Sequence, residues 1–271
     1  MQSLLCFCTL RPQLLLLLLL LLQLPPLSFA AAPVAETITV DHRGGGDFRT
    51  VQAAVDSVPD GNREWIRIHV KKGNYREKVT VPTHKHYILL EGDGCWKTAI
   101  SYGAHAHAGI GHIMRRRRRR NVADYGIVRN IDFKVVAALV GGDKIAFYGC
   151  AFHGFQDTLC DFTGRHYFRR CAITGGIDFI FATAITSTLP PGRQQPGWVT
   201  AHARAGACAA CGLVFRGGSV DGTGRQYLGR TWNRFATVVF YRTDIAGVVV
   251  PQGWQAWHAA PDICDICRDW M

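Results

Sequence analysis

The sequence lacks several features that would point to other protein classes. It contains no Asn-x-Ser/Thr sequon, so N-glycosylation is not expected. No linker rich in Pro, Gly or Ser divides the chain, which favours one large domain of about 240 residues after the N-terminal thirty. No helical period of apolar residues runs through the middle of the chain, so helices are not expected there.

Acidic residues are fewer than basic ones, 20 against 31, and the formal net charge is +11. Six of the positive charges form one arginine run at residues 115–120, and without this run the net charge is only +5. Such a run suits polygalacturonate or nucleic acid. A solvated loop explains it equally simply and is the interpretation that we favour, because export of the chain argues against nucleic acid.

The N-terminus has the order of parts that is typical of a secretory signal. Arg11 precedes an unbroken leucine run at residues 14–22, two prolines end the run, and small residues lead up to Ala30. This pattern predicts a signal peptide over residues 1–30 that is cleaved after Ala30. The alternative is an uncleaved membrane anchor, for which the run is short against the roughly twenty residues of a membrane span. We therefore expect a secreted, extracellular protein.

Two of the ten cysteines lie within the predicted signal, and eight remain. In an oxidising compartment these eight can form disulfides. The pairs Cys208/Cys211 and Cys264/Cys267 each have the two-residue gap of a zinc half-site. Because no other ligand spacing accompanies them, disulfides or free thiols are favoured over zinc.

One short helix and several strands are expected near the start of the domain. Asp47 is a candidate helix cap, and an apolar stripe with helical spacing follows it at Phe48, Val51, Val55 and Val58. This predicts a short amphipathic helix that closes one end of the core. Strands are indicated by alternation over residues 66–70, with a turn at 72–74, by Val79 and Val81, and by the apolar run 87–90.

Similar segments then recur through the middle of the chain. They lie at residues 129–133, 149–152 and 170–173, with looser echoes at 215–220 and 238–245. Asn130, Cys150 and Cys171 mark a spacing of 20 and 21 residues. Short strands that return at this interval predict a solenoid, specifically a parallel β-helix. The competing interpretation is a β-sandwich, whose turn signals recur about every eight to twelve residues.

Two aspartates are separated by the length of one such coil. Asp157 and Asp178 are 21 residues apart, so they would lie on neighbouring strands roughly 5 Å from each other. Two carboxylates this close do not readily ionise together, so one pKa rises while the other stays low. The pair can then supply a general acid and an anionic nucleophile. By spacing alone, two solvated turn aspartates would be the preferred interpretation.

The residues around the pair favour a site. Asp178 lies between apolar neighbours, as expected for a side chain on the face opposite to them. Gln156 stands directly before Asp157 and offers an amide donor for a developing oxyanion.

Four motifs carry a resemblance to the plant pectin methylesterase (pectinesterase) family. Residues 154–159 resemble the family's G-[YF]-Q-D-T-L, residues 178–181 its D-F-I-F, residues 228–232 its L-G-R-P-W, and residues 73–77 its G-x-Y-x-E. The motifs occur in family order, and the similarity runs over residues 36–257. The chain resembles the members without an N-terminal inhibitor-like pro-domain.

This resemblance implies a right-handed parallel β-helix that hydrolyses the methyl esters of homogalacturonan in cell-wall pectin. It implies that Asp178 is the nucleophile, Asp157 the acid and base, and Gln156 the oxyanion donor. Arg230 would keep Asp178 ionised and contact substrate. Substrate binding would also involve Trp232, Phe155 and Lys134, and a core position of Trp232 is the less favoured alternative. No metal or organic cofactor is implied, the protein would be a monomer, and proteinaceous pectinesterase inhibitors are candidate partners.

The sequence departs from the family at several places. Lys134 stands where the family's Q-A-V-A motif has a glutamine that serves as a second oxyanion donor, and about nine residues before it are absent. Its ammonium could donate to the oxyanion or pair with a catalytic aspartate. Ala182 replaces a glycine, the prolines at 190 and 191 come early as if a strand were lost, and residues 259–271 do not resemble the family's C-terminus. We therefore expect a catalytic domain over residues 31–271 that is internally shortened and C-terminally truncated.

Three functions follow from these observations. The leading hypothesis is a carboxylic-ester hydrolase that acts on methyl-esterified pectin. A catalytically impaired, pectin-binding or degenerate member of the family is the alternative that Lys134 and the shortened segments favour. A β-helical lyase or polygalacturonase is weaker, because the motifs match the esterase.

Overall fold

The computed structural model describes residues 33–102, 125–134, 138–179, 184–188, 195–202 and 212–256. Residues 34–271 form one compact unit, and all the elements below belong to it. The predicted signal, the arginine run, both Cys-x-x-Cys pairs and the C-terminal residues from 257 onward lie outside the described ranges. Within those ranges, no helix is long and apolar enough to cross a membrane.

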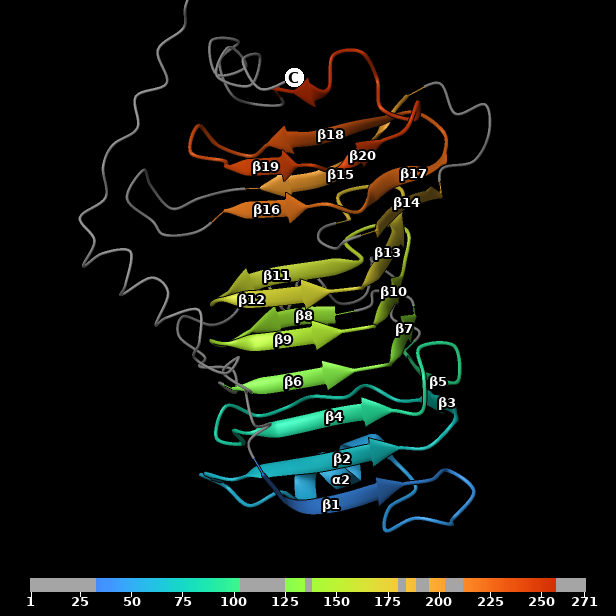
Figure 1. Ribbon diagram of the computed structural model, residues 1–271, viewed down its shortest axis with the longest axis vertical. Helices are drawn as coiled ribbons and strands as arrows, with labels where there is room; N and C mark the ends of the chain where they lie inside the picture. Colours follow the sequence, from blue (N-terminus) through green and yellow to red (C-terminus); the bar gives the residue numbers. More distant parts are fainter. Residues whose placement is uncertain are drawn as a thin grey trace, which may run out of the picture. The chain divides into compact units, whose positions relative to one another are not determined.

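The described chain is built almost wholly of short parallel strands (Figure 1). A six-stranded sheet, called sheet A, contains in spatial order β1 (Val34–Val40), β2 (Trp65–Val70), β4 (Ile88–Gly92), β6 (Gly126–Arg129), β9 (Ile145–Tyr148) and β12 (His166–Arg169). An eight-stranded sheet, called sheet B, contains β3 (Gly73–Arg76), β5 (Thr98–Ser101), β7 (Asp132–Lys134), β10 (Ala151–His153), β13 (Ala172–Gly175), β14 (Ala184–Thr188), β17 (Ser219–Thr223) and β20 (Asp244–Ile245).

The remaining strands form a third face and a small continuation. The third face comprises the pair β8 (Ala138–Gly141) and β11 (Leu159–Thr163), and the trio β15 (Gly197–His202), β18 (Gln226–Thr231) and β21 (Trp254–Gln255). β16 (Leu213–Arg216) and β19 (Val238–Tyr241) pair with each other. Since every one of these pairings is parallel and joins successive turns of the chain, the fold is the predicted parallel β-helix.

Each full coil visits sheet A, sheet B and the third face in that order. In the middle of the stack each coil has the same length, the 21 residues expected from the sequence. Ala138 pairs with Leu159, Ile145 with His166, and Ala151 with Ala172. The preceding coil is slightly shorter, because the partner of Ile145 one coil back is Gly126. Asn130 therefore lies level with Gly149 rather than Cys150, and the first of the two spacings read from the sequence is too long.

The corner between sheets A and B explains why the recurring segments look alike. Asn130, Gly149 and Arg170 all have φ between 53° and 60°, and Gly217 and Arg242 repeat this conformation in the later echoes. One residue in the left-handed region turns the chain sharply enough to begin the next strand. The recurrence in the sequence is thus the repetition of one corner.

The predicted helix is present, but it begins later than expected. α2 covers Val51–Ser57 and is capped by Thr50, whose side chain accepts from the amide of Ala53. Asp47 is not the cap, because its carboxylate accepts from the amide of Thr39 at 2.7 Å and fixes the preceding loop. Val51 and Val55 are buried against the first coils, so the helix covers the core as predicted.

Two smaller strand predictions need correction. Gly73 and Asn74 belong to β3 rather than to a turn. Val79 and Val81 are not in a strand, although both pack against the core. Alternation over such a short stretch records burial of every second side chain, which an extended loop can provide without pairing.

Side chains that point inward from successive coils form a continuous stack of aromatic rings. Phe152 is fully buried, stacks on Phe133 with ring centroids 5.3 Å apart, and meets Phe147 edge to face at 5.6 Å. Phe133 packs against both buried clusters, one around the early coils and one around the later coils. The aromatic stack therefore joins the two halves of the core.

Sheet B takes up an additional strand after the middle coils. β14 pairs directly with β13 and matches Ala184 with Ala172, so the chain returns to sheet B well before a full coil is complete. Among the described residues, sheet A ends at β12. The sheet B strand that follows β14 is β17, and the strand before it, β16, pairs with β19 instead of joining sheet A. Residues 180–183 and 189–194 lie outside the described ranges, so the loss of a strand here stays a prediction.

Candidate active site

The two candidate aspartates occupy the same position in successive coils. Asp157 lies in the turn of residues 154–158, called the site turn, between β10 and the third face. A parallel bridge joins Gln156 to Ile177, and the amide of Asp157 donates to the carbonyl of Ile177 at 3.2 Å. Asp178 therefore lies one coil on from Asp157, at about the 4.8 Å separation of adjacent strands.

Both aspartates adopt the left-handed conformation, with φ of 50° for Asp157 and 51° for Asp178. Non-glycine residues seldom adopt it, and such residues often occur at functional sites. Here Asn130 and Arg170 have the same conformation at a purely structural corner. The conformation therefore reflects a tight turn of the β-helix and does not by itself mark chemistry.

The guanidinium of Arg230 binds both carboxylate oxygens of Asp178. Nε donates to Oδ1 at 2.9 Å, and Nη2 donates to Oδ2 in a short contact. The side chains are 12% and 4% exposed, so this is a buried, bidentate ion pair. A carboxyl group that accepts through both oxygens is ionised, and Arg230 thus fixes both the charge and the orientation of Asp178.

Trp198 supports this ion pair from the neighbouring strand β15. The Arg230 guanidinium lies over the Trp198 ring, 4.2 Å from its centroid, and the Trp198 carbonyl accepts from the amide of Asp178 at 2.8 Å. The indole Nε1 donates to Gln255 Oε1 at 2.7 Å, which holds the ring in place. Sequence reasoning missed Trp198, although its place one full coil after Ile177, with which it forms a parallel bridge, was the signal that could have identified it.

Burial sets the protonation of the aspartate pair. It raises the pKa of Asp157, and the negative charge of Asp178 raises it further, while Arg230 opposes the rise. The pKa of Asp178 is also raised, because burial outweighs the opposing hydrogen bonds and charge of Arg230. Asp157 is thus the member of the pair that more readily holds a proton.

Cys160 lies close to the site but is not a competing nucleophile. Burial raises the pKa of its thiol to about 11, with further contributions from the charges of Asp157 and Asp161. At neutral pH the side chain is a protonated thiol, which is a weak nucleophile.

The other predicted site residues lie around the aspartates in different ways. Phe155 and Gln156 are exposed within the site turn, and Phe155 has 48% of its surface accessible. Trp232 follows directly after β18, is 47% exposed, and is therefore not a core residue. Gln156, Phe155 and Trp232 are all accessible to a bound molecule.

Lys134 contacts a different acid from the one that the sequence suggested. It is the last residue of β7, and its Nζ lies 3.5 Å from Oδ2 of the buried Asp132. In sheet B it pairs with His153, whose Nε2 is 3.2 Å from Asp132 Oδ1. The described ion pair of Lys134 is thus with Asp132 rather than with Asp157 or Asp178.

The G-x-Y-x-E segment performs a structural task. Both oxygens of Glu77 accept from the first amides of α2, those of Val51 and Gln52, at 2.8 Å each. Tyr75 is buried, and its hydroxyl donates to the carbonyls of Val40 and Lys71. The described contacts of this motif therefore fix the helix on the first coil.

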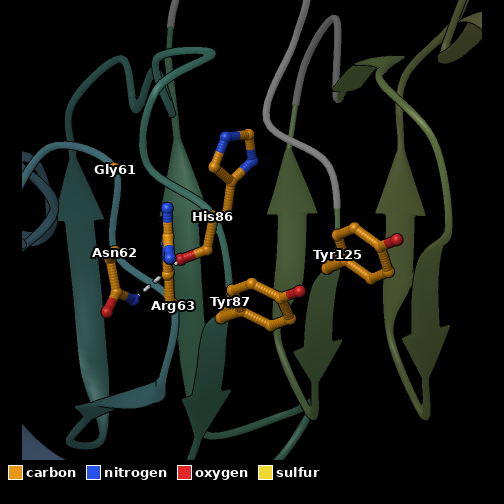
Figure 2. Close-up of a pocket in the computed structure, with 6 residues that line it drawn as sticks. All are labelled: Gly61, Asn62, Arg63, His86, Tyr87 and Tyr125. Atoms are coloured by element: carbon orange, nitrogen blue, oxygen red, sulfur yellow. Dashed lines mark hydrogen bonds between the residues drawn. The ribbon is translucent and has the colours of Figure 1, made fainter.

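A pocket at another corner lies where the chain enters sheet A (Figure 2). It is lined by Gly61, Asn62, Arg63, His86, Tyr87 and Tyr125. Tyr87 and Tyr125 stack with centroids 4.9 Å apart, and Lys144 lies over the Tyr125 ring at 4.3 Å. Asn62 donates to the carbonyl of His86 at 2.9 Å. Because the ring faces are already covered and no acid lines the pocket, it is not the candidate active site.

Comparison with known proteins agrees with the motifs. The model of the family described as Pectinesterase matches residues 37–266. Probable pectinesterase 29 of Arabidopsis thaliana is 39% identical over 250 residues, which cover 82% of this chain and 73% of that protein. Probable pectinesterase 55 of the same plant is 38% identical over 250 residues, with 82% and 74% covered.

Solved structures of similar fold include a pectin methylesterase from carrot. It is 29% identical, covers 84% of this chain and 79% of its own, and superposes with a TM-score of 0.73. A pectin methylesterase in complex with a hexasaccharide has a TM-score of 0.63 at 18% identity, with 81% of each chain covered. The second likeness supports the fold alone.

Proposed function

This chain belongs to the pectinesterase family, and from that premise we propose that it hydrolyses the methyl esters of homogalacturonan in pectin and releases methanol. The observation that supports the proposal most strongly is the buried, bidentate Arg230–Asp178 pair beside Asp157. It distinguishes one ionised carboxylate from one that readily holds a proton, which are the two states that an acyl transfer through an aspartyl intermediate needs.

In the first half of the reaction, a carboxylate oxygen of Asp178 attacks the carbonyl carbon of the methyl ester. The amide of Gln156 donates to the oxyanion that develops, and Phe155 and Trp232 contact the sugar rings. The protonated Asp157 gives its proton to the methoxy oxygen as the C–O bond breaks. Methanol leaves, and an anhydride joins Asp178 to the galacturonyl group.

In the second half, Asp157 is a carboxylate and accepts a proton from water. The resulting hydroxide equivalent attacks the galacturonyl carbon of the anhydride. The bond to Asp178 breaks, so its carboxylate is restored beside Arg230, and the product leaves as galacturonic acid, which gives its proton to solvent. Asp157 is again protonated for the next cycle.

The proposal includes the place of action and the processing of the chain. A cleaved signal over residues 1–30 would deliver a monomeric catalytic domain, residues 31–271, to the cell wall. Methyl-esterified homogalacturonan is the proposed partner there, together with proteinaceous pectinesterase inhibitors. N-terminal sequencing of the secreted protein tests this, because a retained leucine run would instead indicate a membrane anchor.

Methanol release from methylated pectin tests the activity. The secreted chain is expected to release methanol, and Asp178→Ala is expected to release none above background. Lys134→Gln reports on the second oxyanion donor. A faster variant identifies the missing amide as a defect, and an unchanged rate places Lys134 outside the reaction, in agreement with its contact to Asp132.

A non-catalytic, pectin-binding protein is the second candidate. Lys134, which stands in place of the family's glutamine, and the shortened segments expected from the sequence favour it. Binding to immobilised methylated pectin, together with methanol release no greater than that of Asp178→Ala, would establish it. Binding with release excludes it.

A further inference from the structure

Trp96 is the most exposed large hydrophobic residue in the described ranges, with 80% of its surface accessible. It lies in the turn between β4 and β5, and its indole lies against the ring of His153 with centroids 6.1 Å apart. A single exposed aromatic residue is common on protein surfaces and needs no explanation. The charged groups around Trp96 give it a more specific meaning.

A buried carboxylate organises these charged groups. The Asp132 side chain is 5% exposed, and it contacts His153 Nε2 at 3.2 Å and Lys134 Nζ at 3.5 Å. Burial raises the pKa of Asp132, and the charges of His153 and Lys134 oppose that rise. The Lys134 side chain is 50% exposed and that of His153 is 30% exposed. One hidden acid thus holds a cation and an imidazole at the surface beside an accessible indole.

Hydrogen bonds connect this cluster to the site turn. His153 Nδ1 lies 2.9 Å from Thr174 Oγ1. The carbonyl of Thr174 accepts from the amide of Gly154 at 3.2 Å and from the hydroxyl of Thr158 at 3.1 Å. Gly154 and Thr158 are the two ends of the site turn, so the cluster lies directly at the edge from which Asp157 is presented.

The combination of groups selects a class of ligand. A flat indole packs against the apolar face of a sugar ring, and an ammonium forms charge-assisted hydrogen bonds to a carboxylate. Both nitrogens of His153 already have partners, so its part is to hold the indole and the acid Asp132 in place. A pyranose that bears a free carboxylate offers both surfaces. Its methyl ester offers only the ring face, because esterification removes the negative charge.

We propose that Trp96 and Lys134, positioned by His153 and Asp132, form an additional sugar subsite that binds a galacturonate unit with a free carboxylate. The proposal rests on the proposed function, since it takes polygalacturonate as the polymer. The subsite adds a substrate preference: the galacturonate unit bound at Trp96 has a free carboxylate, and the unit at Asp178 has a methyl ester. Partly de-esterified pectin would then be bound more tightly than fully methylated pectin.

Calorimetric titration with a fully de-esterified galacturonate oligomer tests the subsite without any turnover. Trp96→Ala and Lys134→Met are each expected to weaken binding about tenfold, which corresponds to the loss of one stacking or charge-assisted contact. Tyr167→Ala and Lys144→Met are matched controls, because they remove an exposed aromatic ring and an exposed ammonium at other positions. Both controls are expected to leave the dissociation constant unchanged.

Titration with the fully methylated oligomer, in an Asp178→Asn background, separates the two contributions. Trp96→Ala is expected to weaken binding of both oligomers, whereas Lys134→Met weakens binding of the acid alone. Equal losses for acid and ester with Lys134→Met, or no loss with Trp96→Ala, would overturn the proposal. Unchanged circular dichroism melting verifies that each variant is folded.

The two proposals can fail separately. If the chain releases no methanol but shows these affinity changes, the subsite stands and the catalytic proposal falls. If methanol is released while Trp96→Ala and Lys134→Met bind the acid oligomer as the unaltered chain does, only the subsite falls.

Discussion

Arg230 is the residue on which the chemistry of the aspartate pair depends most directly. Without its guanidinium, Asp178 would be a buried carboxyl with no cation in the contacts described, and burial would favour its neutral form. Arg230 is itself fixed by the Trp198 ring at 4.2 Å. The ionised nucleophile is therefore a product of three side chains from three coils.

Replacing Arg230 tests this dependence. Arg230→Gln is expected to lower methanol release about tenfold or more, because a charge-assisted bidentate contact is lost. Its acidic activity limb is expected to move toward higher pH, since the pKa of Asp178 rises when the cation is removed. A pH–rate profile measures both effects, and Arg230→Lys, which keeps the charge without the bidentate geometry, should fall in between. An unshifted acidic limb in Arg230→Gln would contradict the assigned role.

His166 gives stability its own pH dependence. Its fully buried ring has acceptors on both nitrogens, the Asp161 carboxylate at Nδ1 and the Gly142 carbonyl at Nε2, 2.8 Å away. Two acceptors require an N–H on each nitrogen, which is the imidazolium form. Burial lowers the pKa of His166, but the bond and charge of Asp161 and the Gly142 carbonyl outweigh it, and the pKa is raised.

This raised pKa predicts the direction of the stability change. The contribution of His166 is fully present below the unfolded value of about 6.5 and is lost as pH rises through the higher folded value. Thermal melting at a series of pH values should therefore show a fall in melting temperature over that window. His166→Gln should be less stable at acidic pH and lack the fall, whereas a fall retained in the variant would assign it to another group.

At this scale the sequence and its resemblance to the family indicated the two acids and Arg230, but not Trp198 or the ion-pair partner of Lys134. Asp157 and Asp178 could be paired because they are one coil apart and both follow recognisable motifs. The contact of Trp198 with Arg230 joins different coils, and only the coil spacing from Ile177 could have indicated it. The ion pair of Lys134 with Asp132 lies within β7, and the sequence alone did not indicate that Asp132 is buried there. The coils are also not all of one length. A coil length that is wrong by a single position turns a side chain to the other face of a strand.

Among the elements, helix α2 is held at both ends by side chains from elsewhere in the chain. At the N-terminus of α2, the Glu77 carboxylate accepts from the first two amides of the helix. At the C-terminus, the ammonium of the buried Lys85 donates to the carbonyl of Asp56 at 3.0 Å. A negative charge at the N-terminus and a positive charge at the C-terminus both complement the helix dipole. A helix of only seven residues depends on such contacts.

Removing the acid at the helix N-terminus should weaken the first coil. Glu77→Ala is expected to lower the free energy of unfolding by about 1–2 kcal/mol, because two amides lose a charged acceptor. Urea denaturation measures the change, and Glu64→Ala, at an exposed glutamate, serves as the control. Equal effects of the two substitutions would show that the contact with α2 contributes nothing.

The start of this helix shows why caps are difficult to predict from sequence. Asp47 and Thr50 are both good capping residues, and the apolar stripe is compatible with either. The amide of Thr39 donates to the Asp47 carboxylate, so Asp47 is not available as the cap. The hydroxyl of Thr50 accepts from the amide of Ala53 and caps the helix instead. The contact between Asp47 and Thr39 forms only when the loop packs on β1, so the sequence around the helix start does not reveal it.

For the molecule as a whole, the core is divided between early and late coils that meet at the phenylalanine stack. Phe152 lies in the middle of this stack between Phe133 and Phe147. Because each coil contacts only its neighbours, a solenoid transmits stability along its axis through such junctions. The fold was predictable from the regular recurrence of short strands, whereas the junction and the end of sheet A at β12 were not, since both depend on single coils that break the period.

Truncating Phe152 should test the junction. Phe152→Ala is expected to cost about 3–5 kcal/mol of unfolding free energy, because a fully buried ring leaves a cavity that the neighbouring coils cannot fill. The exposed Tyr167→Ala control is expected to change stability by less than about 0.5 kcal/mol. Denaturation followed by both fluorescence and circular dichroism measures the cost, and a loss below about 1 kcal/mol would show that the stack is not tightly packed.

The distance along the chain between Asp178 and Arg230 has a consequence for biosynthesis. The two residues are 52 positions apart, whereas Asp157 precedes Asp178 by a single coil. During translation, Asp157 and Asp178 are therefore added to the chain long before Arg230, which orients Asp178. Throughout that interval the nascent chain carries its acids without their arginine, and a transcript that stops between these codons yields a protein that cannot form the ion pair.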